Sequence, residues 1–169
     1  MGVGIEVYIE FNISVHFLKT NSGKKGEGMP VVRNPQFYFR EGFCWIDVNS
    51  TYLKARVKSN GIFDVLSMSL FTMTDIPDIY FVGLINSEFI SLYVDNFINN
   101  TSHFQINDAR QLPIIIPDSD SLKTVCDVVK KAIAIKITDL HSKGTDSITK
   151  DMLILQELID SIVFQLYRI

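Results

Sequence analysis

The chain has 169 residues, of which 47% are hydrophobic and 21% are charged. This composition is typical of a folded protein and excludes global disorder. The net charge is −3, but it is unevenly spread. Residues 1–60 carry eight Lys or Arg side chains against five Asp or Glu, whereas residues 61–169 carry eight against fourteen. The basic first third is compatible with a surface that faces a polyanion.

The two cysteines and the hydropathy pattern indicate a cytoplasmic protein. Cys44 and Cys126 are far apart and match no metal-ligand spacing, so we expect buried free thiols. No basic segment followed by an apolar run marks a signal peptide, and no apolar stretch reaches 18 residues. We therefore expect a cytoplasmic location and no membrane partner.

The first 75 residues have the pattern of a mostly β structure. Residues 3–18 alternate and are rich in β-branched and aromatic types, which predicts one or two strands, and 19–30 form a flexible basic loop. A turn at Asn34–Pro35 should precede an aromatic strand. Three further short strands are predicted in "FCWIDV", "YLKARV" and "GIFDVLSMSLF".

Beyond Pro77 the periodicity becomes helical. A helix is predicted over about 79–99, then a loop over 100–117 that contains a helical turn at 107–111 and a strand over Leu112–Ile116.

Two long amphipathic helices complete the chain. The first covers about 120–141, with N-cap candidates in Asp118 to Ser121, and Gly144 is a plausible residue to end it. The second begins at Ser147 and has an apolar residue at steps of three and four, which is a heptad pattern. Joined by a short loop, they should fold back as an antiparallel hairpin.

The predicted fold class is α+β, with two domains. Residues 1–117 should form a β-rich part with one packed helix, and 118–169 the helical hairpin. The hairpin can be a plain core element or an arm that docks another chain or domain.

The segment Asn34–Phe37, "NPQF", differs by one residue from the Asn-Pro-Pro-aromatic loop of amino-methyltransferases. Such an enzyme also needs a Gly-rich strand-to-helix turn for S-adenosylmethionine and a βαβ core, and this sequence contains neither pattern. It has no Gly-x-Ser-x-Gly elbow, and its three histidines occur in unrelated settings. We therefore predict no catalytic, cofactor-binding or metal-binding residue and no enzyme activity for this chain.

Five segments carry a resemblance to a known family by their order and spacing: "RNPQFYFREGFCWIDV" (33–48), "LKARVKSNGIFDV" (53–65), "YFVGLINSEFISLYV" (80–94), "FQINDARQLPIIIP" (104–117) and "LQELIDSIVFQLYRI" (155–169). Together they resemble the TaqI-like specificity, or target-recognition, domain at the C-terminus of type IIG restriction–modification and BREX-type DNA adenine methyltransferases. That domain is similar to the specificity subunits of type I systems.

The resemblance implies a domain that reads double-stranded DNA for a methyltransferase domain of a parent protein. S-adenosylmethionine would bind that other domain, and this chain would hold no cofactor. The methyltransferase core has no counterpart in this sequence, and residues 1–30 match the family poorly. The resemblance therefore implies the family's DNA recognition for this chain, but not its methyltransferase activity.

The DNA contacts are expected in the basic, β-rich part. Lys24 and Lys25, in their Gly-rich loop, are the preferred phosphate contacts. Arg40 and Arg56 lie inside the shared segments, so a structural role is the alternative for them. The complete set of basic candidates is Lys24, Lys25, Arg33, Arg40, Lys54, Arg56 and Lys58, and the candidates for base reading are Asn34, Gln36 and Asn60.

A second function class stays open. The acidic balance of residues 61–169 favours a hairpin that docks a protein partner without any DNA contact. The oligomeric state does not follow from the sequence.

Overall fold

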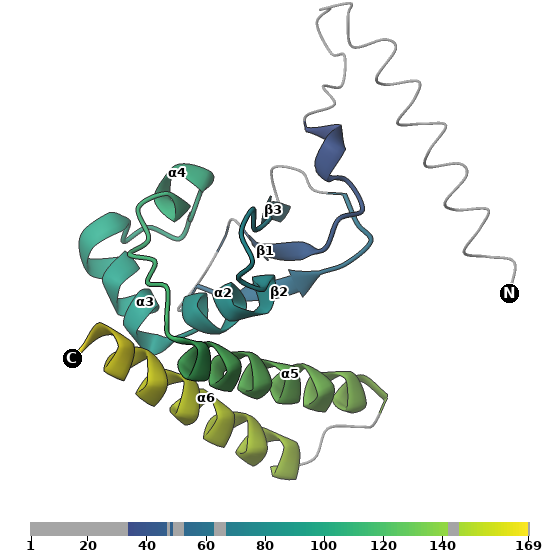
Figure 1. Cartoon of the computed structure of the whole chain (residues 1–169), viewed down its shortest axis with the longest axis vertical. Helices are drawn as coiled ribbons and strands as arrows, with labels where there is room; N and C mark the ends of the chain where they lie inside the picture. The colour runs from purple at the N-terminus through teal and green to yellow at the C-terminus, as the bar shows by residue number, and fades with distance from the viewer. Residues whose placement is uncertain (1–33, 47, 49–52, 63–66, 142–145, 169) are drawn as a thin grey trace, which may run out of the picture. The chain divides into compact units, whose positions relative to one another are not determined.

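The computed structural model of the chain describes residues 34–46, 48, 53–62, 67–141 and 146–168 (Figure 1). The chain divides into two units, Met1–Tyr38 and Phe39–Ile169. The strands predicted over 3–18, the basic loop over 19–30 and the helix end at Gly144 lie outside the described residues. The sheet and the helical hairpin both belong to the second unit, so the division into 1–117 and 118–169 stays a prediction.

In the first unit, the described residues form one turn of 3₁₀-helix, η1 (Pro35–Phe37). Asn34 precedes it with a left-handed φ of 49°, and Pro35 supplies the φ that a helix start needs. The N–H groups of Phe37 and Tyr38 donate to the carbonyls of Asn34 and Pro35 at 3.0 and 3.1 Å. The predicted turn is confirmed. The aromatic strand predicted directly after it was wrong, because these local bonds close the backbone into a turn.

The second unit contains a three-stranded antiparallel sheet. Its strands are β1 (Gly42–Ile46), β2 (Ala55–Lys58) and β3 (Ser67–Leu70), in the order β2-β1-β3. These are the short strands that the sequence predicts. Phe43 and Trp45 of β1 are buried on one face of the sheet, beside Ala55 of β2.

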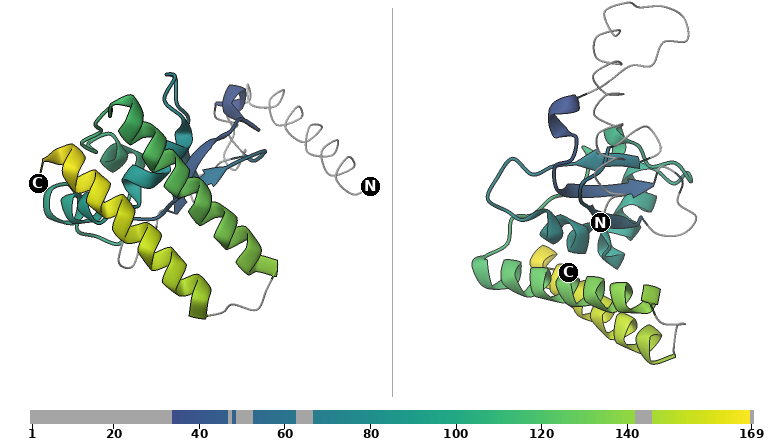
Figure 2. Two further views of the ribbon diagram at one scale, coloured as in Figure 1. Left: turned by 60° about the horizontal axis from the view of Figure 1, so that its bottom comes forward. Right: turned by 90° about the vertical axis from the view of Figure 1, so that its right-hand side faces the viewer.

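Helix α2 (Asp78–Ile85) packs against that buried face and is itself covered on its other side by the hairpin (Figures 1 and 2). The Phe81 ring stacks on Phe43 with centroids 5.6 Å apart. Because α2 is a middle layer, it is apolar nearly all round, as a helix buried on several sides should be. Gly83 brings it close to the hairpin: a Cβ there would lie 2.7 Å from Val125 and 2.8 Å from Val129.

The helix predicted over 79–99 is interrupted, so the single continuous helix was wrong. After α2 the chain turns at Asn86 and Ser87 and continues as α3 (Glu88–Tyr93) and the π-helical turn η2 (Val94–Ile98). The Ser87 hydroxyl donates to the carbonyl of Leu84 at 2.7 Å and accepts from the N–H of Ile90 at 3.3 Å. This one side chain ends α2 and caps α3.

The segment over 100–117 contains the predicted helical turn, α4 (Ile106–Ala109), but not the predicted strand. Pro113 and Pro117 have no N–H to donate to a ladder. The carbonyls of Pro113 and Ile115 accept hydrogen bonds from the hydroxyls of Tyr167 and Tyr80. The prediction of a strand over Leu112–Ile116 was wrong. Two tyrosine hydroxyls bond to carbonyls that a neighbouring strand would otherwise use.

The C-terminal helices α5 (Ser119–His141) and α6 (Asp146–Tyr167) lie side by side and antiparallel (Figures 1 and 2). The first half of α5 buries Val125, Cys126 and Val129, and α6 buries Ile159 and Val163. The α+β fold class with a C-terminal helical hairpin is therefore confirmed. In the described part of the chain, no helix is both long and apolar enough to cross a bilayer.

Asp118 caps α5, as the sequence predicts. Its carboxylate accepts from the N–H groups of Asp120 and Ser121 at 3.0 and 2.9 Å and from the Ser121 hydroxyl at 3.0 Å. The hydrogen bond from the Ser121 N–H is the main cause that lowers the pKa of Asp118 below its ordinary value of 3.8.

A pH-dependent effect of Asp118→Ala follows. A depressed folded-state pKa means that the cap stabilises fully above the unfolded-state pKa and stops stabilising as the pH falls through the folded-state value. We expect Asp118→Ala to have a lower Tm than the wild type at pH 7, and the gap to narrow as the pH falls below the ordinary carboxylate pKa of 3.8 and through the lower folded-state pKa. Thermal melts by circular dichroism over pH 2.5–7 measure this. A gap that stays constant with pH would contradict it.

Candidate nucleic-acid interface

Strand β2 places basic residues on one face of the sheet. Its residues alternate between faces, and directly opposed residues in neighbouring strands share a face. Lys58 is opposite Gly42 and Arg56 is opposite Cys44, whereas Ala55 is opposite Trp45 on the buried side. Arg56 and Lys58, with Lys54 just before the strand, therefore lie on the face that points away from α2.

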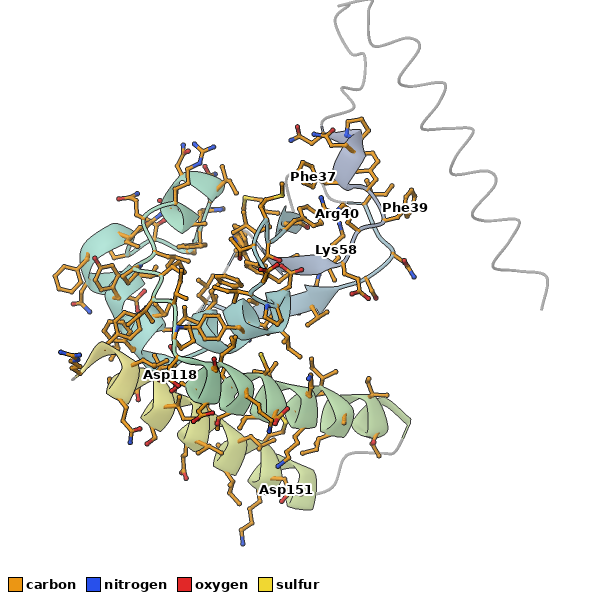
Figure 3. All side chains as sticks on the ribbon, in the orientation of Figure 1. Phe37, Phe39, Arg40, Lys58, Asp118 and Asp151 are labelled. Carbon is orange, nitrogen blue, oxygen red and sulfur yellow. The ribbon has the colours of Figure 1, made fainter. Side chains whose placement is uncertain are left out.

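Arg40 joins this group through an aromatic side chain. The Arg40 guanidinium lies 5.9 Å from the centre of the Phe71 ring, and the Lys58 ammonium lies 5.5 Å from the same ring. Figure 3 shows Arg40 and Lys58 close together beside the sheet. A shared aromatic ring attracts both cations and holds them near each other in spite of their like charge.

Lys58 differs from the other members in its burial. It is 8% exposed, and burial lowers the pKa of its ammonium, an effect that the neighbouring Cys44 thiol opposes. Because its ammonium is shielded from solvent, Lys58 is better suited to a structural role within the sheet than to a contact with phosphate. The DNA contact of Lys58 stays a prediction.

Arg40, Lys54 and Arg56 are exposed. The Arg56 Nε donates to the Cys44 Sγ at 3.4 Å, which orients the guanidinium over the sheet. Among the described residues, no carboxylate forms an ion pair with Lys54 or Arg56. We define the basic face as Arg40, Lys54, Arg56 and Lys58.

Six further predicted residues are not included in this definition. Lys24, Lys25 and Arg33 lie outside the described residues. Asn34 and Gln36 are exposed on the 3₁₀ turn of the first unit. Asn60 is exposed after β2 with a φ of 48°, a left-handed conformation that asparagine tolerates in turns. The role of these three polar residues in base reading stays a prediction.

A cleft that the sequence pattern did not predict lies between the edge of the sheet and the hairpin. Its volume is about 850 Å³. One wall is β2 with the preceding Leu53 and Lys54, and α2 with Asn86 lies at its base. The opposite wall comes from the hairpin and is mostly apolar, with Ala132, Ile133, Ile137, Met152 and Leu155. Three polar or charged hairpin residues, Lys136, Gln156 and Asp160, also line it.

The cleft exists because the hairpin is longer than the helix that it covers. α2 has 8 residues and α5 has 23, so at about 1.5 Å per residue the far end of the hairpin extends well past α2. The heptad pattern continues into the part of the hairpin that extends past α2. A heptad pattern much longer than the helix it covers is the feature of the sequence that could have indicated the cleft.

The basic face offers positive charge and hydrogen-bond donors, which suit phosphate oxygens and base edges. In the regions that the structure describes, no cluster of three His, Cys, Asp or Glu side chains could hold a metal ion.

No model of a known protein family matches this sequence, and comparison with curated proteins gives no match.

Proposed function

We propose that this chain is a DNA sequence-recognition module of a restriction–modification or phage-defence adenine methyltransferase. Its role would be to position duplex DNA for a catalytic domain outside this chain, where S-adenosylmethionine and the flipped adenine would bind. The observation that carries the proposal is the basic face, because Arg40, Lys54 and Arg56 are exposed together on one side of the sheet. The family resemblance supports the same function.

The residues of the basic face have distinct roles in this proposal. Lys54 is a flexible point charge suited to a phosphate, and the planar guanidinium of Arg56 can donate two parallel hydrogen bonds to a phosphate or a guanine. Arg40 adds a third cation, held over Phe71. Phosphate contacts set the register of the duplex, and base contacts by the polar candidates Asn34, Gln36 and Asn60 select the sequence.

The proposal predicts salt-dependent DNA binding that requires the basic face. Each phosphate contact contributes about 0.9 to the slope of log affinity against log salt. We expect Lys54→Ala/Arg56→Ala to reduce that slope by about 2 and to weaken binding at least tenfold at about 50 mM salt. Fluorescence anisotropy with a mixed-sequence duplex from about 50 to 200 mM salt measures both quantities.

A matched control separates the basic face from net charge. Lys131→Ala/Lys150→Ala removes the same two charges from exposed positions on the hairpin, and it should bind DNA as the wild type does. Equal losses in the two double variants would show a non-specific charge effect and contradict the assignment. A Lys24→Ala/Lys25→Ala variant tests the loop contacts in the same assay.

The helical hairpin supports a second candidate function, the docking of a protein partner. Leu153, Ile154 and Leu158 are large apolar side chains exposed on α6. Exposed apolar residues grouped on one helix are typical of an interaction site. A protein that binds no DNA at low salt, and whose solubility improves when Ile154 and Leu158 are replaced by polar residues, would favour this candidate.

A further inference from the structure

At the outer edge of β2, the backbone of one residue already forms hydrogen bonds with a side chain. The Asn86 side-chain carbonyl accepts from the N–H of Ala55, and its amide donates to the carbonyl of Ala55, both at 2.8 Å. Both backbone groups of Ala55 thus point away from β1. An asparagine side chain takes the place of one residue of a neighbouring strand.

The next outward position on this edge is Val57. In an antiparallel ladder, every second residue directs its N–H and C=O away from the partner strand. Since Ala55 points outward, Val57 does too. No hydrogen bond joins the outward groups of Val57 to another described residue, and its side chain is 41% exposed. An edge with such a pair of groups is a template for an additional strand.

The surroundings of the edge define what kind of strand fits. Side chains of an added strand alternate between the two faces of the sheet. On the Ala55 and Val57 side they would enter the cleft and meet the apolar wall that includes Ile133 and Ile137. On the other side they would lie beside Lys54 and Arg56, which also line the cleft. Apolar residues suit the first face and carboxylates suit the second.

We propose that β2 binds an extended segment of a partner protein whose residues alternate between apolar and acidic, added as a fourth strand of the sheet. Backbone hydrogen bonds to Val57 would provide affinity. The hairpin wall and the basic residues would provide selectivity, as in other complexes formed by strand addition. This inference goes beyond DNA binding, and it makes the acidic segment a competitor for Lys54 and Arg56.

The test uses the full chain and a labelled, acetylated peptide of alternating valine and glutamate, with fluorescence anisotropy as the readout. We expect saturable binding, at least tenfold tighter than that of the matched valine–lysine peptide. The same valine–glutamate peptide with methylated backbone nitrogens should lose binding at least tenfold, because it cannot donate to the edge. This comparison leaves the protein unchanged, so misfolding cannot explain a loss.

Two protein variants test the two walls of the cleft. Val57→Pro removes the outward N–H, and proline is tolerated on an edge strand, so peptide binding should fall at least tenfold. Ile137→Asp places a charge in the apolar wall and should also abolish binding. Leu153→Asp is its control, because Leu153 is similarly exposed (58%, against 53% for Ile137) but does not line the cleft.

The outcomes separate this inference from the proposed function. Val57→Pro and Ile137→Asp keep every basic residue, so both should bind DNA as the wild type does. Peptide binding that survives backbone methylation or Val57→Pro would overturn strand addition. Absence of binding by the unmodified peptide at millimolar concentration would overturn the proposal, whatever the result with DNA.

Discussion

Replacing Trp45 with alanine is expected to lower the free energy of unfolding by about 3–5 kcal/mol. The side chain is 1% exposed in the core beneath the sheet. Its Nε1 donates to the carbonyl of Phe104 at 2.9 Å, and the two rings meet edge to face with centroids 5.8 Å apart. The substitution therefore creates a cavity and leaves a buried carbonyl without its donor, and the two costs act in the same direction.

Urea unfolding followed by circular dichroism measures this effect. Trp45 is the only tryptophan in the sequence, so its fluorescence cannot report on the variant. Trp45→Phe is the matched control: it keeps most of the apolar volume and removes the indole N–H, and we expect it to cost clearly less than the alanine variant. If the two variants were equally destabilised, the hydrogen bond to Phe104 would dominate over the cavity.

Gly83→Ala is expected to destabilise the protein by about 1–3 kcal/mol, although alanine favours helices more than glycine does. A Cβ at this position would lie 2.7 Å from one methyl group of Val125 and 2.8 Å from one of Val129. Both valines are buried in the first half of α5, and branched side chains have few rotamers with which to give way. The added methyl group would push α2 and α5 apart.

A double-mutant cycle identifies the cause of this loss. Val125→Ala alone should destabilise, because it removes buried methyl groups, but in the Gly83→Ala background it should relieve the clash. We expect a favourable coupling of about 1 kcal/mol or more between the two substitutions, measured by urea unfolding. Additive effects would indicate that the helices do not meet at Gly83 as closely as the structure shows.

The hairpin is the element that the sequence determines most completely. Its apolar residues repeat at three and four, its first helix begins at a capping aspartate, and both properties are local. A side chain such as Asp118 meets its partners Asp120 and Ser121 within one turn, so no distant residue is needed. The short strands around Trp45 and Arg56 were likewise evident from their β-branched and aromatic composition.

Elements whose bonding partners are distant in the chain were predicted less well. The helix over 79–99 is interrupted at Asn86 and Ser87: Ser87 forms local hydrogen bonds that end one helix and cap the next, and Asn86 bonds with Ala55, 31 residues away. The segment over Leu112–Ile116 looks like a strand by composition, but tyrosine hydroxyls from α2 and α6 take its carbonyls. Local propensity cannot include such partners, because they become neighbours only once the chain has folded.

The features of the candidate site likewise fall into those that the sequence predicts and those that depend on the tertiary structure. The sequence by itself determined the α+β class, the helical hairpin and the concentration of basic residues in the first third, since composition and periodicity carry that information. Only the tertiary structure decided that Arg40, Lys54 and Arg56 are exposed while Lys58 is buried, and that the hairpin extends past α2 to form a cleft at Val57. Burial and edge exposure depend on which layers pack together, and that packing is set by contacts between residues far apart in the chain.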